Sequence, residues 1–147
     1  MNMEKQDKYF KLAQYFAETF SKDNSTKVGA IFLAPKTLQI LSTGYNGMPR
    51  GFDESLDKRW ERPLKYLYVE HAERNAIYNA CRNGTSLDGS ICFVTMFPCS
   101  DCMRGLIQSG VKIIVTKEPN IECDRWGSHF KASLEMANEC GIQLIYV

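Results

Sequence analysis

The stretch ICFVTMFPCSDCMRGLIQSGVKIIVT, residues 91–116, places two apolar runs on either side of a segment that opens with Pro98-Cys99. The runs 91–95 and 111–116 are short and rich in β-branched residues, as buried strands usually are. Pro98 suits the start of a helix, because its missing N–H costs nothing there. The stretch therefore predicts a strand, a helix that ends at Ser109-Gly110, and a second strand.

The rest of the chain predicts the elements that surround this unit. Apolar and aromatic residues recur at helical spacing over residues 4–21, which indicates an amphipathic helix with its aromatic stripe in the core. Residues 44–69 are interrupted by glycine and proline and are expected to be irregular, and a loop of that length is usually functional. The other expected elements are a strand over 28–33, a turn at 34–37, a strand over 38–43, a helix over 71–82, a loop over 117–126, a helix near 128–140 and a strand over 142–147.

The order of these elements predicts the fold class. Strands and helices alternate in the second half of the chain, which favours a mixed sheet flanked by helices. Together with the hairpin of the first half, this predicts an α/β fold with a central mixed five-stranded sheet in a three-layer α/β/α arrangement. The 147 residues are enough for one domain, spanning 1–147, with its own core.

Composition argues against several classes of protein. The 18 basic and 17 acidic residues give a formal net charge of +1, which provides no broad positive field for a nucleic-acid backbone. No apolar run approaches the length of about 18 residues that a membrane span needs, and the N-terminal segment is charged and amphipathic rather than a signal sequence. The six cysteines are scattered, which indicates free thiols in a reducing compartment. We therefore expect a cytoplasmic protein with no membrane or nucleic-acid partner.

Three side chains have the types and the spacing of a catalytic zinc site. Cys99 and Cys102 are three positions apart, so both sulfurs point to the same side of one helical turn. The start of a helix also favours thiolates, which are the metal-binding form of cysteine. His71 adds a nitrogen ligand from a second segment, and three protein ligands leave the fourth tetrahedral position for water.

Glu73, two positions after His71, has a different predicted role. A hard carboxylate suits this soft site less well than a thiolate, so Glu73 is predicted to be the catalytic acid/base rather than a ligand. Zinc lowers the pKa of a bound water from about 15.7 to about 7, so hydroxide is available at neutral pH. H-x-E followed by P-C-x-x-C is the signature of zinc-dependent nucleobase deaminases, in which ammonia leaves the ring.

A structural zinc site is the alternative interpretation of the C-x-x-C pair. Such a site would be closed by a fourth protein ligand. The candidates are Cys81, Cys92, Cys123, Cys140 and His129, and none of them forms a second pair with metal-ligand spacing. Pro98 and the H-x-E motif are independent of the cysteine pair, and both favour catalysis.

Several segments outside the metal motif resemble one family in particular. They are Lys27-Val28-Gly29-Ala30, Gly44-Tyr45-Asn46-Gly47-Met48-Pro49, Lys65-Tyr66 with Tyr68-Val69 before His71, Asn75-Ala76-Ile77, and Phe97 through Cys102. From about Lys27 onward, the chain resembles the deoxycytidylate (dCMP) deaminases of the cytidine deaminase superfamily, the phage and bacterial forms most. The resemblance implies the cytidine deaminase-like fold and the hydrolysis of dCMP to dUMP and ammonia, which feeds dTMP synthesis. If the chain is phage-encoded, its expected location is the host cytoplasm.

In addition to the zinc ligands and the acid/base, the resemblance implies roles for several single residues. The backbone N–H of Ala72 would hold the ring carbonyl, and the backbone carbonyl near Phe97 would accept from the amine. Asn46 would contact the sugar, or would be a turn residue in left-handed conformation. Arg74 would face either the substrate phosphate or solvent. Residues 44–69 contain no cysteine or histidine for a second metal site, so one zinc ion per chain is expected.

Regulation is a further implication of the family resemblance. It comprises activation by dCTP with Mg²⁺, inhibition by dTTP, and a homohexamer. Gly44, Tyr45 and Gly47 lie in a segment associated with the effector, where backbone N–H groups of a turn would cradle phosphates. Arg82 lies in another such segment. The alternatives are a tight turn after a strand and an ordinary helix C-terminus, where arginine complements the helix dipole.

Three other functions stay open on the sequence. A tRNA or polynucleotide deaminase would share the metal motif but would normally show a basic face. A cytidine or deoxycytidine nucleoside deaminase would need no cation for a phosphate. A non-catalytic zinc protein that senses nucleotides would tolerate the loss of Glu73, which is present. In the loop 117–126, Lys117 and Arg125 are further candidates for the phosphate, and Trp126 is a candidate for aromatic packing or, less favoured, for ring stacking.

Overall fold

A five-stranded mixed sheet forms the centre of the molecule. The computed structural model describes residues 1–147. The strands follow the order β2-β1-β3-β4-β5, with β1 antiparallel to β2 and β3, and with β3, β4 and β5 parallel to one another. Their bounds are β1 (Gly29–Leu33), β2 (Ile40–Tyr45), β3 (Ile91–Val94), β4 (Ile113–Thr116) and β5 (Gln143–Tyr146). The predicted mixed five-stranded sheet is confirmed.

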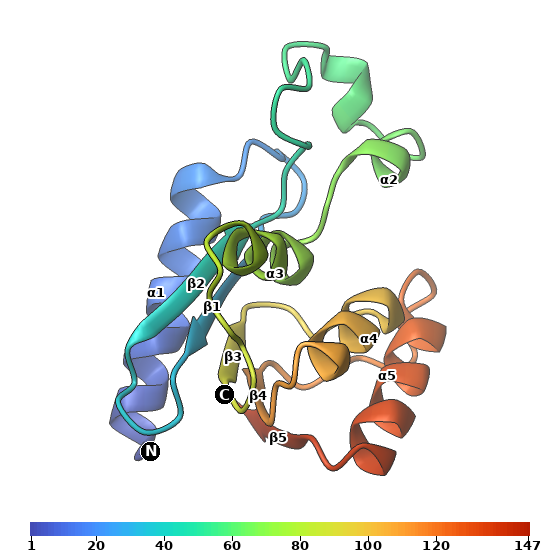
Figure 1. Cartoon of the computed structure of the whole chain (residues 1–147). Coiled ribbons are helices and arrows are strands. Elements are labelled where there is room, and N and C mark those ends of the chain that lie inside the picture. Colours follow the sequence, from blue (N-terminus) through green and yellow to red (C-terminus); the bar gives the residue numbers. More distant parts are fainter.

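Helices cover both faces of this sheet, so the molecule has the predicted three layers (Figure 1). One face packs against α1 (Met3–Phe20), and the other packs against α3 (Ala72–Arg82), α4 (Ser100–Gln108) and α5 (Gly127–Glu139). Side chains alternate along the strands, so Ile31 lies with α1 whereas its neighbour Phe32 lies with the other three helices. None of the helices combines the length and the apolar character that crossing a membrane requires.

The hairpin of β1 and β2 differs from its expected bounds. The second strand, expected over 38–43, begins at Ile40 and extends to Tyr45. Leu38 has a φ of 58°, in the left-handed region, which keeps the chain in the turn for longer. Gly44 is therefore a strand residue under α3, where an added Cβ would lie 2.3 Å from the carbonyl oxygen of Ala72. The alternative that Gly44 and Tyr45 belong to a tight turn is wrong, because both lie in β2, and the close approach of α3 explains the glycine.

The segment between β2 and α3 is also more regular than expected. It contains the short helices η1 (Asp57–Trp60) and α2 (Lys65–Tyr68). The Trp60 indole N–H donates to the carbonyl of Glu54 at 3.0 Å, and the Arg59 guanidinium lies 4.2 Å from the ring centroid of Phe52. In Figure 1 this segment extends beyond the end of the sheet. Neither helix has enough residues for a hydrophobic repeat, so the sequence pattern could not predict them.

Candidate metal centre and its pocket

The metal motif lies where two helices begin. His71 is the N-cap of α3, Cys99 is the N-cap of α4, and Cys102 lies in the first turn of α4. Both N-cap residues have extended backbone conformation, and neither side chain forms a capping hydrogen bond, so both are directed to other partners. The first N–H groups of each helix place partial positive charge beside the sulfurs, which favours thiolates.

The three candidate ligand atoms converge on one point. Nδ1 of His71 lies 3.4 Å from Sγ of Cys99 and 3.4 Å from Sγ of Cys102. Zinc bonds of about 2.0–2.1 Å to nitrogen and about 2.3 Å to sulfur place such atoms about 3.5 Å apart in a tetrahedral site. One imidazole nitrogen and two sulfurs therefore fit a zinc ion with one position left for water. This is the only group of three or more such side chains in the structure that could hold a metal ion.

The protonation of these ligands depends on the contacts among them. A hydrogen bond from the Cys102 thiol lowers the pKa of Cys99 to about 4, although burial opposes the shift. The same hydrogen bond, together with burial, raises the pKa of Cys102, and the hydrogen bond with Cys99 raises the pKa of His71. Metal binding requires both thiolates and a neutral imidazole, so a metal ion competes with protons for these three side chains.

Glu73 lies beside the ligands and is almost fully enclosed. Only 3% of the residue is exposed, and burial raises the pKa of its carboxyl group. The positive charge of His71 opposes this rise. A carboxyl group with a raised pKa can accept a proton and donate it again near neutral pH, which is the behaviour of a general acid/base.

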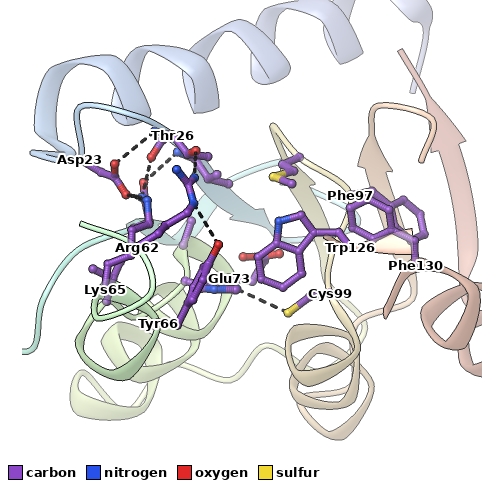
Figure 2. Close-up of a pocket in the computed structure, with 16 residues that line it drawn as sticks. Asp23, Thr26, Arg62, Lys65, Tyr66, Glu73, Phe97, Cys99, Trp126 and Phe130 are labelled. Atoms are coloured by element: carbon purple, nitrogen blue, oxygen red, sulfur yellow. Dashed lines mark hydrogen bonds and ion pairs between the residues drawn. The ribbon is translucent and has the colours of Figure 1, made fainter. Parts of the chain in front are cut away.

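A pocket extends from the metal ligands to the segment after α1 and to α2 (Figure 2). We call the side with His71, Glu73 and Cys99 the metal end, and the side with Asp23, Thr26, Arg62 and Lys65 the polar end. The middle is mostly apolar and aromatic, and it is lined by Val28, Tyr66, Val69, Met96, Phe97, Trp126 and Phe130. A flat ring with polar groups on both sides suits such a pocket.

A buried ion pair organises the polar end. Nζ of Lys65 lies 2.6 Å from Oδ2 of Asp23, and these side chains are only 7% and 1% exposed. Oδ1 of Asp23 accepts the backbone N–H groups of Ser25 and Thr26, at 2.9 and 3.2 Å. Burial alone would raise the pKa of Asp23, but the hydrogen bonds from Lys65 and Ser25 outweigh burial and lower it. The ion pair therefore ties the segment after α1 to α2.

Comparison with known proteins identifies the family. The family described as the cytidine and deoxycytidylate deaminase zinc-binding region matches residues 3–118. The chain belongs to this deaminase family. A deaminase of Aliivibrio fischeri is 36% identical over 141 residues, which cover 95% of this chain and 91% of that protein. The human deoxycytidylate deaminase is 36% identical over 127 residues, which cover 78% of this chain and 69% of the human protein.

A solved structure of the same family supports the fold along the whole chain. The dCMP deaminase of cyanophage S-TIM5, crystallised with dCMP and dUMP, has a TM-score of 0.79 and 30% sequence identity, and the match covers 100% of this chain and 99% of that one. The predicted deaminase family and the predicted cytidine deaminase-like fold are confirmed.

The deaminase pocket contains three of the four predicted substrate residues. Ala72 and Phe97 line it next to Cys99. Ala72 is the first residue of α3, so its N–H has no acceptor within the helix. Asn46, the third of these residues, lines the pocket nearer to the polar end, where Asp23 and Thr26 contact its amide.

The amide of Asn46 is engaged within the protein. Its Oδ1 accepts from the Ser21 hydroxyl and from the Val28 N–H, both at 2.8 Å, and its Nδ2 donates to the carbonyl of Thr26 at 2.8 Å. The alternative that Asn46 is a left-handed turn residue is wrong, because Leu38 alone among the non-glycine residues has a positive φ. Asn46 instead holds the segment after α1 against the start of β1.

Arg74 lies outside the deaminase pocket. Its guanidinium pairs with the carboxylate of Glu70 and lies 3.7 Å from that of Asp101. Glu70 also accepts the backbone N–H of His71 at 3.0 Å and the Tyr78 hydroxyl at 3.2 Å. Arg74 therefore connects the starts of α3 and α4 beside the metal ligands.

The predicted effector residues lie apart from the catalytic pocket. Tyr45 and Gly47 line a second, polar hollow together with Arg50. Gly44 is buried under α3, and Arg82 is exposed in the last turn of α3, outside this hollow. The structure thus brings two of these four residues together.

Sequence reasoning missed the composition of the polar end. Thr26 and Arg62 belong to no motif that indicates a ligand. Lys65 and Tyr66 resemble a segment of the family, but the sequence indicated no role for them. Trp126 packs edge-on against His71, with ring centroids 5.8 Å apart, and it also lines the pocket. Lys117 and Arg125, the other candidates for the phosphate, are exposed and lie outside the pocket.

Proposed function

We propose that this protein is a dCMP deaminase, which hydrolyses dCMP to dUMP and ammonia and so supplies dUMP for dTMP synthesis. The observation that carries the proposal is one pocket with a candidate zinc-ligand set and Glu73 at one end and the polar end, which contains Arg62, at the other. The cyanophage relative, crystallised with dCMP and dUMP, supports a nucleotide substrate.

The metal end provides the chemistry of this reaction. Zinc held by His71, Cys99 and Cys102 would supply a water that ionises near neutral pH, because the metal lowers its pKa to about 7. Glu73 would accept a proton of the attacking water on a carboxyl oxygen, as the new C–O bond forms at C4 of the ring. Glu73 would pass this proton to the ring nitrogen N3 and carry the remaining proton of the water to the amino group, so that the C–N bond breaks and ammonia leaves.

Backbone groups would orient the ring in front of Glu73. The N–H of Ala72, which has no acceptor within its helix, would donate to the ring carbonyl, and the backbone carbonyl near Phe97 would accept from the amino group. Trp126 and Phe130 bound the same part of the pocket and provide apolar surface for the ring. A site that hydrogen-bonds the polar groups of its substrate strongly disfavours rings without them.

Asn46 is proposed to contact the sugar. Because its amide already has partners within the protein, a sugar hydroxyl would share or replace the bond from Nδ2 to the Thr26 carbonyl. The role of Asn46 is therefore to hold the walls of the pocket as well as to touch the substrate.

Ammonia release by the zinc-loaded protein tests the function. We expect fast turnover of dCMP and slow turnover of deoxycytidine at equal concentration. Equal turnover of both would move the function to a nucleoside deaminase. Absence of turnover on both, with zinc bound, would contradict the proposal and would direct the search to polynucleotide substrates.

We also propose that the enzyme is a homohexamer in the cytoplasm, activated by dCTP with Mg²⁺ and inhibited by dTTP. The second hollow, with Tyr45, Gly47 and Arg50, supports an effector site apart from the catalytic pocket, and Arg82 is a further candidate at the end of α3. The rate should depend sigmoidally on dCMP and become hyperbolic with dCTP and Mg²⁺. A rate curve unchanged by dCTP at every dCMP concentration would contradict the regulation, and sedimentation would determine the oligomer.

A further inference from the structure

One arginine in the pocket has no acidic partner. Arg62 takes part in none of the ion pairs of the structure. Its Nε–H donates to the hydroxyl of Tyr66 at 2.9 Å, and its Nη2 donates to the hydroxyl of Thr26 at 3.2 Å. Both acceptors are neutral, so they orient the guanidinium without cancelling its charge. A guanidinium has five N–H donors, and those not used here remain for a ligand.

The other cation of the polar end is already neutralised. Nζ of Lys65 is 2.6 Å from the carboxylate of Asp23 and also donates to the Ser25 hydroxyl at 2.9 Å. Removing Lys65 from Asp23 would leave a buried carboxylate unpaired, which is costly. The one uncompensated positive charge among the side chains of the polar end is therefore that of Arg62.

Aromatic contacts relate Arg62 to the metal end. The ring of Tyr66, which accepts from Arg62, lies edge-on to Trp126 with centroids 6.2 Å apart. Trp126 in turn lies edge-on to His71 at 5.8 Å. Figure 2 shows Arg62 and Tyr66 on the opposite side of the pocket from Cys99, with Trp126 between them. Because both ends line one pocket, a ligand that extends from the metal end would direct its far end toward Arg62.

We propose that Arg62 binds the 5′-phosphate of the substrate and thereby makes the enzyme select the nucleotide over the nucleoside. The inference rests on the proposed function and adds the residue that binds the phosphate. A guanidinium offers two parallel N–H groups to two phosphate oxygens, which a lysine ammonium cannot do. Tyr66 is a positioning residue in this arrangement, because it holds Nε of Arg62.

The test compares two substrates in two variants of the zinc-loaded enzyme. Arg62→Gln should lower kcat/KM for dCMP by about 10- to 100-fold, the usual range for a charged hydrogen bond to phosphate, and change kcat/KM for deoxycytidine by less than about twofold. The effect should appear in KM more than in kcat and should shrink with added salt, because Arg62 is exposed. Lys58→Gln is the matched control, because it removes one exposed positive charge from the same segment outside the pocket. It should leave kcat/KM unchanged for both substrates.

Two milder variants separate charge from geometry. Arg62→Lys keeps the positive charge but loses the two parallel N–H donors of the guanidinium. It should therefore keep more of the preference for dCMP than Arg62→Gln does, but less than wild type. Tyr66→Phe keeps the ring that packs on Trp126 and removes only the hydroxyl, so it should reduce the preference for dCMP by about two- to fivefold. If Tyr66 positions Arg62, the preference for dCMP over deoxycytidine should fall from wild type to Tyr66→Phe and fall further in Arg62→Gln.

An equal loss on both substrates in Arg62→Gln, or no loss on either, would overturn the proposal. The failure of the proposed function looks different, because the wild-type enzyme itself would then not deaminate dCMP. In that case, calorimetric binding of dUMP and deoxyuridine to wild type and Arg62→Gln still decides the question. The phosphate contact is supported if wild type binds dUMP more tightly than deoxyuridine and Arg62→Gln does not. It is refuted if the ratio of the two affinities is the same in both proteins.

Discussion

The two ends of the pocket are built in different ways. At the metal end, His71 and Glu73 come from one short stretch and Cys99 and Cys102 from another, and each stretch starts a helix packed on the sheet. At the polar end, a loop residue and a four-residue helix are joined through the pair of Asp23 and Lys65, which are 42 positions apart. Local spacing therefore places the groups proposed for the chemistry, whereas long-range contacts build the part that we propose recognises the phosphate.

Removing a metal ligand should have the largest effect, and it should be confined to the metal end. Cys102→Ser replaces a soft sulfur by a harder and weaker oxygen ligand, so zinc content should fall well below one ion per chain and ammonia release should fall to background. Metal analysis and the deamination assay measure both. Cys81→Ser, at an exposed position outside the ligand group, should keep zinc and activity. A fully zinc-loaded Cys102→Ser protein would refute the ligand set.

Glu73→Gln should separate metal binding from catalysis. Zinc content should stay at the wild-type level, while the rate should fall by about 10²–10⁴, the usual contribution of a general acid/base. Because burial disfavours the charged form of Glu73, the neutral amide should leave the melting temperature unchanged or higher. Near-normal turnover in this variant would remove Glu73 from the mechanism.

Breaking the ion pair should damage the polar end and spare the metal site. Lys65→Met leaves the carboxylate of Asp23 buried and unpaired, which should lower the free energy of unfolding by about 3–5 kcal/mol in urea titrations. Lys8→Met removes one partner of an exposed helix pair with Glu4, and it should cost less than about 0.5 kcal/mol. Zinc content should be normal in both folded proteins. A similarly small cost for both variants would show that the buried pair does not organise the polar end.

The smallest effect concerns acid stability. The pKa of Asp23 is lowered in the folded protein, so its stabilising effect is complete above its unfolded value of about 3.9 and is lost as the pH falls through the lower folded value. The difference in free energy of unfolding between wild type and Asp23→Asn should therefore be constant from about pH 5 to 7 and shrink below about pH 4. Urea titrations across this range measure it. A difference that stays constant into strong acid would show that Asp23 titrates alike in both states.

The strand–helix–strand core was predictable because its signals are local. Continuous apolar runs marked β3 and β4, and Pro98 and Gly110 marked the two ends of the helix between them. The segment 46–70 was harder, because α2 has only four residues and cannot show a helical repeat. Gly44 was misread for a related reason: a glycine in a strand and a glycine in a turn look alike until the packing of α3 is known.

The sequence by itself predicted the candidate zinc ligands, the candidate acid/base and the family, because their signals are short local motifs, such as two cysteines whose helical spacing puts them on one side wherever the helix lies. The tertiary structure alone decided which cation stays free. Arg62 and Lys65 are both basic and lie three positions apart, and only the placement of Asp23 next to Lys65 distinguishes them. Pairing depends on contacts between distant segments, which no local pattern records. The same reasoning applies to Arg74, which follows Glu73 in the chain but pairs with Glu70 and Asp101 outside the pocket.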